Sequence, residues 1–390
     1  MAPRPARTLS RWSKWLPVVL LAACGGEYPQ TTFEPVSEFG RVINSLFTNT
    51  FWWTIGILVL VEVLILVFVY RYRERPGQPH PKPIHGNVKL EFLWTVIPAI
   101  IVLFLAIPTI QVVFETQRPA PEDALTVEVI GHQWWWEYRY PEYGVRTANE
   151  VVLPQGRPIN LKMHSADVIH SFWVPRIGGK RDVNPQPRPR EGEPTRSNHI
   201  VFTLDTTGYF LGQCAEFCGA SHAIMRTAVV SKTPAEFEEW IASMGGSAQA
   251  ALPATPPADT LTVTDTVGAP AAVAVAPQPA ATAPQSLTPE EERGKQLFTG
   301  RVCIACHTVK GTTAAGQLGP DLTRFGSRRY VGAGARPNTL ENVVAWITDP
   351  QSVKPGALMP GAHTPGGGMA PTNLSDEEVR AIAAYLLSLK

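Results

Sequence analysis

Two long apolar runs near the N-terminus are the strongest pattern in the chain. They cover residues 51–70 and 93–114. About twenty apolar residues are enough for a helix to cross a hydrocarbon core about 30 Å thick. We therefore predict two membrane-spanning helices joined by a loop over residues 71–92. Three arginines follow the first run at once: Arg71, Arg73 and Arg75. Because positive loops stay in the cytoplasm, both ends of the chain are expected outside.

Each predicted span contains residues that a simple membrane helix avoids. Glu62 lies near the middle of the first run, where a carboxylate must face protein or a wet cavity. We interpret it as a protonated glutamate that hydrogen-bonds to a partner helix. Pro98 and Pro108 interrupt the second run, which membrane helices tolerate when neighbouring groups satisfy the freed carbonyls.

Short runs of alternating apolar and polar residues begin at Leu125. The run from Leu125 to Ile130 alternates as a half-buried strand does. Four similar runs follow, at residues 151–153, 159–163, 200–204 and 227–231. Turn-forming residues separate them, which predicts an antiparallel all-β sandwich or barrel over residues 120–240. Residues 178–198 are rich in Gly, Pro and Arg and are expected to form a long surface loop.

Helix signals dominate the last quarter of the chain. Thr288-Pro-Glu-Glu291 offers an N-cap, a proline at the first helical position and a glutamate at the third. Ser375-Asp-Glu-Glu378 repeats this capping box before apolar residues at helical spacing. A third helix is expected over residues 339–348. We therefore predict an all-α domain over residues 287–390.

The segment before this domain, residues 245–286, is dominated by Ala, Pro, Thr and Val and carries little charge. Such a composition favours a semi-extended tether over a packed core. An insertion without consequence is the alternative interpretation.

The extreme N-terminus has the pattern of a secretory signal. Basic residues precede a short apolar run that ends in Leu21-Ala-Ala-Cys24-Gly25, which resembles a bacterial lipobox. Residues 1–23 are thus predicted to be a signal peptide, and Cys24 to carry a lipid. Residues 24–50 would form an extracytoplasmic segment before the first span. A plain signal peptide is the alternative.

Composition narrows the functional classes. A chain of 390 residues is expected to hold two or three domains. Its formal net charge of +1 lacks the basic excess that nucleic-acid binding needs. We assign no structural disulfide to its five cysteines. One is expected to take a lipid, two a metal and two a haem.

Four soft or imidazole donors fall within twelve residues of one another: Cys214, Cys218, His222 and Met225. On a β sandwich a distant strand would add a further ligand, and His170 is the candidate. Thiolate, imidazole and thioether suit copper. Two thiolates, two imidazoles and one thioether are enough for two coppers that share bridging sulfurs.

Three other interpretations of this cluster stay open on the residues alone. The Cys-x3-Cys pair would form a disulfide in an oxidising compartment. Zinc binds two Cys and two His, but thioether is a poor zinc ligand and the usual spacing is absent. A single blue copper needs only one thiolate.

A second centre is predicted at Cys303-Ile-Ala-Cys306-His307, the spacing of covalent c-type haem attachment. Both thiols would add to the haem vinyl groups and His307 would ligate the iron. A redox Cys-x-x-Cys pair is the competing interpretation. Met359 is the favoured sixth ligand, since Pro360 stiffens its loop. The other candidates for this position are Met369 and His363. Arg328 and Arg329 are interpreted as solvated surface residues in preference to propionate partners.

Several segments resemble subunit II of haem–copper cytochrome c oxidases. They are the run from Gly131 to Pro141, the run from Ser165 to Pro175, the thiol cluster, and the two spans with Trp94-Thr-Val-Ile-Pro98. The resemblance covers roughly residues 35–240. It implies a cupredoxin-like domain that holds a dinuclear copper centre, CuA.

The resemblance also implies roles for individual residues. The CuA ligands would be His170, Cys214, Cys218, His222, Met225 and the backbone carbonyl of Glu216. The Glu216 side chain would point to a magnesium site shared with subunit I. Trp134 matches the electron-entry tryptophan of the family, although at least one of Trp134, Trp135 and Trp136 is expected to be a core or interface aromatic residue. Glu91 matches a carboxylate near the mouth of a proton pathway in subunit I; an interfacial charge is the alternative.

One segment departs from the family pattern. The family has a compact turn leading to Arg-x-Asn after the stretch that matches Gly179 to Asp182, whereas here the run from Arg188 to Asn198 is longer. The arginine and asparagine contacts to subunit I are therefore not carried over.

The C-terminal domain resembles a class I cytochrome c. Lys354-Pro-Gly-Ala-Leu-Met359-Pro360 is similar to its methionine loop. Gly319-Pro320 is similar to the segment whose carbonyl accepts the N–H of the proximal histidine and so orients it.

Together these resemblances imply a multidomain chain of the caa3 type. A two-helix transmembrane hairpin would be followed by an all-β cupredoxin-like domain and an all-α cytochrome c domain. Electrons would enter at one covalent haem c, pass to CuA and continue to a haem of subunit I. That partner would reduce oxygen and translocate protons.

The expected partners are subunit I, subunit III, membrane lipid, and cytochrome c or a quinol-oxidising complex as electron donor; nucleic acid is not expected. The expected location is the bacterial cytoplasmic membrane, with copper and haem domains on the periplasmic side. A subunit of a CuA-containing nitric oxide reductase and a stand-alone membrane-tethered electron shuttle are the alternatives.

Overall fold

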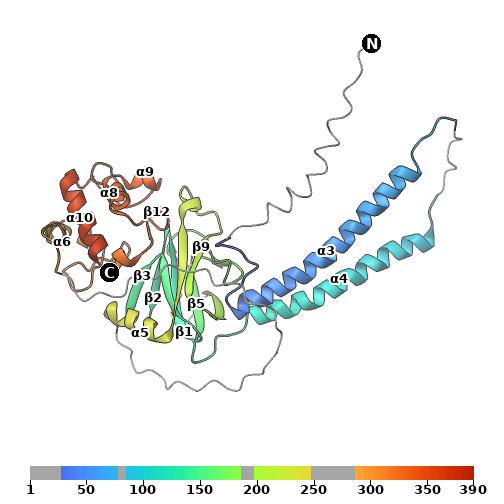
Figure 1. The fold of residues 1–390 in the computed structure, drawn as a ribbon, viewed down its shortest axis with the longest axis horizontal. Helices are drawn as coiled ribbons and strands as arrows, with labels where there is room; N and C mark the ends of the chain where they lie inside the picture. The colour runs from blue at the N-terminus through green and yellow to red at the C-terminus, as the bar shows by residue number, and fades with distance from the viewer. Residues whose placement is uncertain (1–27, 78–84, 186–196, 247–285) are drawn as a thin grey trace, which may run out of the picture.

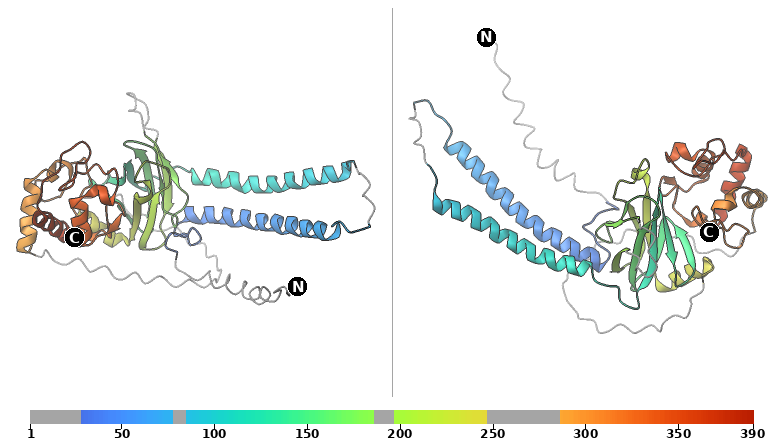
Figure 2. Two further views of the ribbon diagram at one scale, coloured as in Figure 1. Left: turned by 90° about the horizontal axis from the view of Figure 1, so that it is seen from above. Right: turned by 180° about the vertical axis from the view of Figure 1, so that it is seen from behind.

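Three regions follow one another along the chain: a helical hairpin, a β sandwich and a helical domain (Figure 1). The computed structural model describes residues 28–77, 85–185, 197–246 and 286–390. The predicted signal peptide, Cys24 and most of the predicted tether lie outside these residues. Figure 2 shows the hairpin projecting from one side of the sandwich and the helical domain on the other.

The hairpin consists of α3 (Glu38–Arg71) and α4 (Val88–Thr116), which contact each other and contain the two predicted spans. Both are long and apolar enough to cross a membrane. α3 begins well before its apolar run because the Ser37 side chain accepts a hydrogen bond from the Gly40 N–H and caps the helix. The first turn is therefore part of the outer domain, where Phe39 is buried.

The sandwich has two five-stranded sheets. The first, in the order β3-β2-β1-β5-β8, consists of β1 (Leu125–His132), β2 (Trp135–Tyr140), β3 (Val145–Ala148), β5 (Pro158–Ser165) and β8 (Asn198–Thr203). The second, in the order β4-β10-β9-β6-β7, consists of β4 (Glu150–Pro154), β6 (His170–Trp173), β7 (Arg181–Val183), β9 (Gly208–Cys214) and β10 (Arg226–Lys232).

The predicted antiparallel arrangement is wrong for one pair in each sheet. β1 pairs with β5 in parallel, and β10 pairs with β4 in parallel. The chain runs from β1 through β2 and β3 on one side, crosses to the other sheet as β4, and returns as β5 on the opposite side of β1. This crossover leaves β5 running in the same direction as β1.

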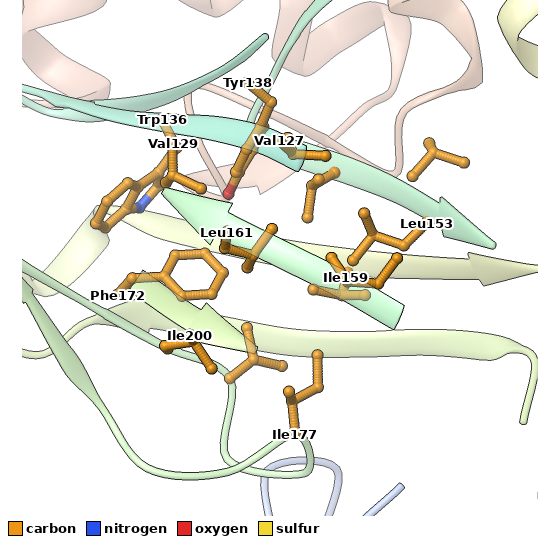
Figure 3. Packing of buried hydrophobic residues seen from close by; sticks show 14 of the residues in the cluster. Val127, Val129, Trp136, Tyr138, Leu153, Ile159, Leu161, Phe172, Ile177 and Ile200 are labelled. Carbon is orange, nitrogen blue, oxygen red and sulfur yellow. The ribbon is translucent and has the colours of Figure 1, made fainter. Parts of the chain in front are cut away.

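The core lies between the two sheets, where alternate residues of each strand meet (Figure 3). In β1 the side chains of Leu125, Val127 and Val129 are fully buried, as the period of a strand requires. Trp136 of β2 is fully buried and contacts Phe172 of β6 edge-on, with ring centroids 5.5 Å apart. This contact joins the two sheets directly beneath the thiol cluster.

The expected surface loop over residues 178–198 is wrong at its start. Arg181–Val183 forms β7, which pairs with β6 so that Val183 lies opposite His170. This edge strand is too short to show an alternating pattern. Residues 186–196 lie outside the described part of the chain. The strands β2, β3, β6 and β9 and the helix α5 (Pro234–Ser243) were also absent from the sequence prediction.

The helical domain contains α6 (Pro289–Gly300), α7 (Cys303–Cys306), α8 (Leu340–Thr348), α9 (Pro350–Val353) and α10 (Asp376–Ser388), with a small hairpin of β11 (Tyr330–Val331) and β12 (Arg336–Pro337). Both predicted capping boxes are confirmed, with Thr288 and Ser375 as N-caps. α6 packs on α10 at Gly294, which is buried.

Candidate metal centre and haem pocket

The thiol cluster forms where two strands of one sheet come together. β9 ends at Cys214 and pairs with β6, so that Phe172 lies opposite Cys214 and His170 lies two residues away. The loop from Cys214 to β10 then returns past the same point and contains a short 3₁₀ turn, His222–Ile224. The pairing of β6 with β9 thus brings His170, the distant histidine that the sequence predicted as a ligand, next to Cys214.

The donor atoms form two groups around a pair of sulfurs. The Cys214 and Cys218 sulfurs are 3.8 Å apart, and both cysteines are free. The His170 Nδ1 atom is 3.9 Å from the Cys214 sulfur, and the Glu216 carbonyl oxygen is 3.2 Å from it. At the other end, the His222 Nδ1 atom and the Met225 Sδ atom each lie 3.7 Å from the Cys218 sulfur.

This geometry tests the competing interpretations. A disulfide requires sulfurs about 2.05 Å apart, so the pair is not bonded. Each sulfur has its own neighbouring donor atoms: His170 Nδ1 and the Glu216 carbonyl oxygen for Cys214, and His222 Nδ1 and Met225 Sδ for Cys218. Two soft metal ions bridged by both sulfurs fit this donor set, whereas one tetrahedral zinc would leave ligands unused.

Charged groups around the cluster prepare it for metal. The Asp167 carboxylate lies 2.8 Å from the Nε2 atom of His170, which leaves Nδ1 directed at Cys214. Burial opposes charge on His170, but Asp167 and the Cys214 sulfur outweigh it and raise its pKa. A hydrogen bond with the Cys218 thiol lowers the pKa of Cys214 to about 3, while the same contact raises the pKa of Cys218. The hydrogen bond between the two thiols thus favours ionisation of Cys214 over ionisation of Cys218.

Trp134 lies against the cluster and is largely buried. Its indole N–H donates to the Cys218 carbonyl at 3.0 Å, and the Gln133 amide donates to the same oxygen at 2.8 Å. Of the two neighbouring tryptophans, Trp136 is a core residue and Trp135 stacks on His132 with ring centroids 4.2 Å apart.

A cavity of about 410 Å³ opens in the helical domain. Its volume is in the range of cofactor sites. Cys303, Cys306, His307 and Pro320 line it, and Trp134 of the sandwich lies at its boundary. The cavity is thus shared between the two domains.

The His307 side chain is oriented for axial ligation. Its Nδ1–H donates to the Pro320 carbonyl at 2.9 Å, which leaves Nε2 free. Burial lowers the pKa of His307 and so favours the neutral ring, in which the Nε2 atom has a lone pair. An apolar cavity, two cysteines and an oriented neutral histidine fit a covalently attached haem.

Among the candidates for the sixth position, Met359 and Met369 line the cavity. Met359 packs against the domain core, whereas Met369 is 36% exposed. His363 is exposed and lies 3.8 Å from the Asp376 carboxylate, away from the cavity lining.

Arg328 corrects one expectation. It lines the cavity and donates to the Asp321 carbonyl, and burial lowers its pKa, so it is not a solvated surface residue. Sequence pattern could not reveal this because the residue sits in an irregular loop. Arg329 is exposed, as expected.

Other predicted site residues lie apart from these two centres. Glu91 is in the first turn of α4, on the hairpin, and accepts a hydrogen bond from the Asn87 N–H at 3.2 Å. Its side chain therefore helps to cap the helix. The Glu216 side chain is half-buried beside Phe217, which is 74% exposed. Cys24 lies outside the described residues.

Sequence reasoning missed three residues beside the sites: Asp167, which orients His170, and the buried Lys354 and half-buried Glu150 where the two domains meet. Asp167 and Lys354 each stand in a segment singled out for its ligands, but nothing in a single sequence marks their own roles, and nothing marks Glu150 at all.

Comparison with protein families gives three matches along the chain. Residues 35–112 match the transmembrane domain of cytochrome c oxidase subunit II, residues 144–232 match its periplasmic domain, and residues 291–390 match cytochrome c. The matches follow the same order as the hairpin, the sandwich and the helical domain.

Similar curated proteins carry the name cytochrome c oxidase subunit 2. That of Alkalihalophilus pseudofirmus is 35% identical over 315 residues, covering 80% of this chain and 76% of that protein. That of Bacillus subtilis is 32% identical over 327 residues, covering 80% and 77%. The solved periplasmic domain of subunit II from Bradyrhizobium japonicum is 32% identical and covers 33% of this chain and 97% of that one, with a TM-score of 0.29. The length and identity of the shared sequence show that this chain belongs to the cytochrome c oxidase subunit 2 family, with a cytochrome c domain at its C-terminus.

Proposed function

We propose that this chain is the electron-input subunit of a respiratory terminal oxidase of the caa3 type. It accepts electrons at a haem c, passes them to a dinuclear copper centre, CuA, and delivers them to the haem of subunit I. Subunit I reduces oxygen to water and couples this reaction to proton translocation. The observation that carries the proposal is the contact of Trp134 with both the thiol cluster and the haem cavity.

The sandwich residues hold the copper pair. Cys214 and Cys218, whose sulfurs are 3.8 Å apart, would both bind the two ions. His170 and the Glu216 carbonyl serve one end, and His222 and Met225 serve the other. Asp167 keeps His170 in the ligating orientation.

The helical domain holds the haem. Cys303 and Cys306 would attach the haem through thioether bonds, and His307 and Met359 would serve as ligands of its iron; all four residues line the cavity. The Pro320 carbonyl accepts a hydrogen bond from the His307 Nδ1–H and so orients the ring, while burial lowers the pKa of His307. Arg328, half-buried in the cavity wall, would supply positive charge for a propionate. When bound, the haem and the copper pair each accept and release one electron.

Trp134 connects the two centres. Its indole N–H is bonded to the carbonyl of Cys218, and its ring faces Gly356 of the methionine loop. A Cβ atom placed on Gly356 would lie only 2.5 Å from the Trp134 ring, so the loop and the ring are in direct contact. The residue assigned to electron entry thus touches a ligand loop of each centre.

The remaining assignments follow the family. Partners are subunit I, subunit III, and a cytochrome or quinol-oxidising complex as donor. Glu216 would face a magnesium ion at the boundary with subunit I, and Glu91 would lie at the entrance of a proton pathway. The chain would sit in the bacterial cytoplasmic membrane with both redox domains on the periplasmic side and a lipid on Cys24.

Metal analysis of the full chain tests the proposal. We would purify it with haem and copper and record metal content with visible and electron paramagnetic resonance spectra. Two coppers and one haem per chain, with a mixed-valence copper signal, are expected. Cys218→Ser should abolish that signal and keep the haem.

The matched control is Cys303→Ser in the helical domain. It removes one thioether and should change the haem spectrum while the copper signal stays. One zinc per chain, or a Cys214–Cys218 disulfide without copper, would overturn the proposal.

A further inference from the structure

The helical domain rests on the sandwich through two close contacts that only glycine permits. A Cβ atom on Gly334, which has a φ of +83°, would lie 2.5 Å from the Arg226 Cβ atom. Gly356, with a φ of +84°, approaches the Trp134 ring equally closely. The Arg226 N–H donates to the Ala333 carbonyl at 2.9 Å, and the Ser221 hydroxyl donates to the Pro355 carbonyl at 2.6 Å. The two domains are therefore in direct contact through close backbone packing and hydrogen bonds.

One buried charge of the helical domain enters this boundary. Lys354 is 3% exposed. Its Nζ atom donates to the Gly332 carbonyl of its own domain at 2.9 Å and to the Ile224 carbonyl of the sandwich at 3.1 Å. Within the described ranges, no carboxylate lies within ion-pair distance of it. Burial lowers its pKa to about 7, which reflects how little water reaches this amine.

The sandwich in turn places one carboxylate, that of Glu150, against the helical domain. The Glu150 carboxylate, at the start of β4, accepts a hydrogen bond from the Arg329 N–H of the helical domain at 2.8 Å. The Tyr209 hydroxyl donates to the same oxygen at 3.0 Å, and the Arg329 guanidinium stacks 4.0 Å above the Tyr209 ring. Burial raises the pKa of Glu150 despite these contacts.

These two groups flank the haem cavity. Lys354 lines it, and so does Asn149, the neighbour of Glu150. Charged groups at a boundary add little net attraction, because removing them from water is costly. They do select one arrangement, because any shift leaves a charge without its hydrogen bonds. Each domain therefore places one charge against the other domain, next to the cavity.

We propose that Lys354 and Glu150 are positioning residues that hold the helical domain on the sandwich in one register, with the haem cavity against Trp134. The inference deepens the proposed function and rests on it for its purpose. Neither residue ligates metal or haem. They act on the fraction of molecules in which the two domains are docked and the two centres are adjacent.

Removing either anchor leaves its partner groups buried and unpaired. Leaving a buried hydrogen-bonding group without its partner weakens an interface by about 30-fold. The ratio of docked to undocked molecules is expected to fall by that factor. The amide of Arg226 reports this ratio, because its hydrogen-bond acceptor belongs to the other domain.

The test uses the full chain in detergent micelles with haem and copper bound. Hydrogen exchange at the Arg226 amide is measured for Lys354→Met and for Glu150→Met, which removes the acceptor oxygens of that side chain. Each variant should lose about 30-fold in protection and slow electron transfer from haem to copper, while the spectrum of methionine-ligated haem stays unchanged. The matched controls are Lys390→Met and Glu239→Met, which replace exposed residues of the same two domains and should change nothing.

Unchanged Arg226 protection in both anchor variants would overturn the inference. If Lys354→Met also removed the methionine-ligated spectrum, its effect would be on the ligand loop, and Glu150→Met, in the other domain, would decide. Protection lost with Glu150→Met upholds the anchors, and protection kept refutes them. Amide exchange does not depend on electron transfer, so a failure of the copper assignment would be visible separately.

Discussion

Gly294 is the position in the helical domain where a single methyl group should do most harm. It lies on α6, where that helix crosses α10. A Cβ atom built on Gly294 would meet the Ala381 carbonyl oxygen at 2.0 Å and the Tyr385 Cβ atom at 2.9 Å. Heavy atoms prefer separations of about 3.5 Å, so Gly294→Ala forces the two helices apart.

Two opposing effects decide the size of the loss. Alanine is a better helix former than glycine, which adds about 0.5–1 kcal/mol to stability. Overpacking a core costs about 1–3 kcal/mol. Because backbone atoms of α10 form the obstacle, side-chain rotation cannot relieve it, and the cost should fall in the upper part of that range. We expect a net loss of about 1–2 kcal/mol, which lowers the melting temperature of a domain of this size by roughly 5–15 °C.

The assay is thermal unfolding of the full chain followed by haem absorbance. Gly300→Ala is the matched control, because Gly300 is on the same helix and has no atom within 4 Å of the added Cβ. This control should unfold at or slightly above the wild-type temperature. If Gly294→Ala were as stable as Gly300→Ala, the steric reasoning would be refuted.

Three further predictions concern the sandwich and its boundary. Burial opposes the charge of Glu137, but its bonds to a histidine and two arginines lower its pKa to about 2. The ionised Glu137 therefore contributes about 3 kcal/mol to the free energy of unfolding at pH values above its ordinary pKa of 4.5, and this contribution is lost as the pH falls from about 5 to 2. Hydrogen-exchange protection of the β2 amides should decrease over the same pH range. Glu137→Gln should remove this pH dependence. Gly356→Val should slow haem-to-copper electron transfer in flash experiments by pushing the loop off Trp134, whereas Gly368→Val, with a similar φ but open space, should not. Asp167→Asn should weaken copper binding by about 10–100-fold in chelator competition and leave the haem spectrum unchanged; an unaltered affinity would mean that His170 needs no support.

Local patterns predicted the elements whose causes are local. The apolar runs lie within α3 and α4, and the capping boxes at Thr288 and Ser375 start α6 and α10. The candidate donors of the thiol cluster were also identifiable, because four of them occupy one short segment. The order of the domains followed from the same patterns.

Long-range contacts account for what the sequence did not reveal. β6 and β7 are too short to alternate and exist because they pair with β9 and with each other. Arg328 looks like a surface residue in the sequence, and its burial results from the folding of loops around the cavity. Lys354 acquires its second hydrogen bond only when another domain supplies the Ile224 carbonyl.

The two centres depend on each other through packing and share no ligand. Every donor of the thiol cluster belongs to the sandwich, and every ligand proposed for the haem belongs to the helical domain, each with its own core. The contacts across the boundary include the Trp134 ring, the two anchors, the Ser221 hydroxyl and the backbone hydrogen bond from Arg226 to Ala333. Variants within either cluster should therefore empty one site and leave the other filled. Variants at the boundary should leave both sites filled and change only the passage of electrons between them, a separation that a single shared core would not allow.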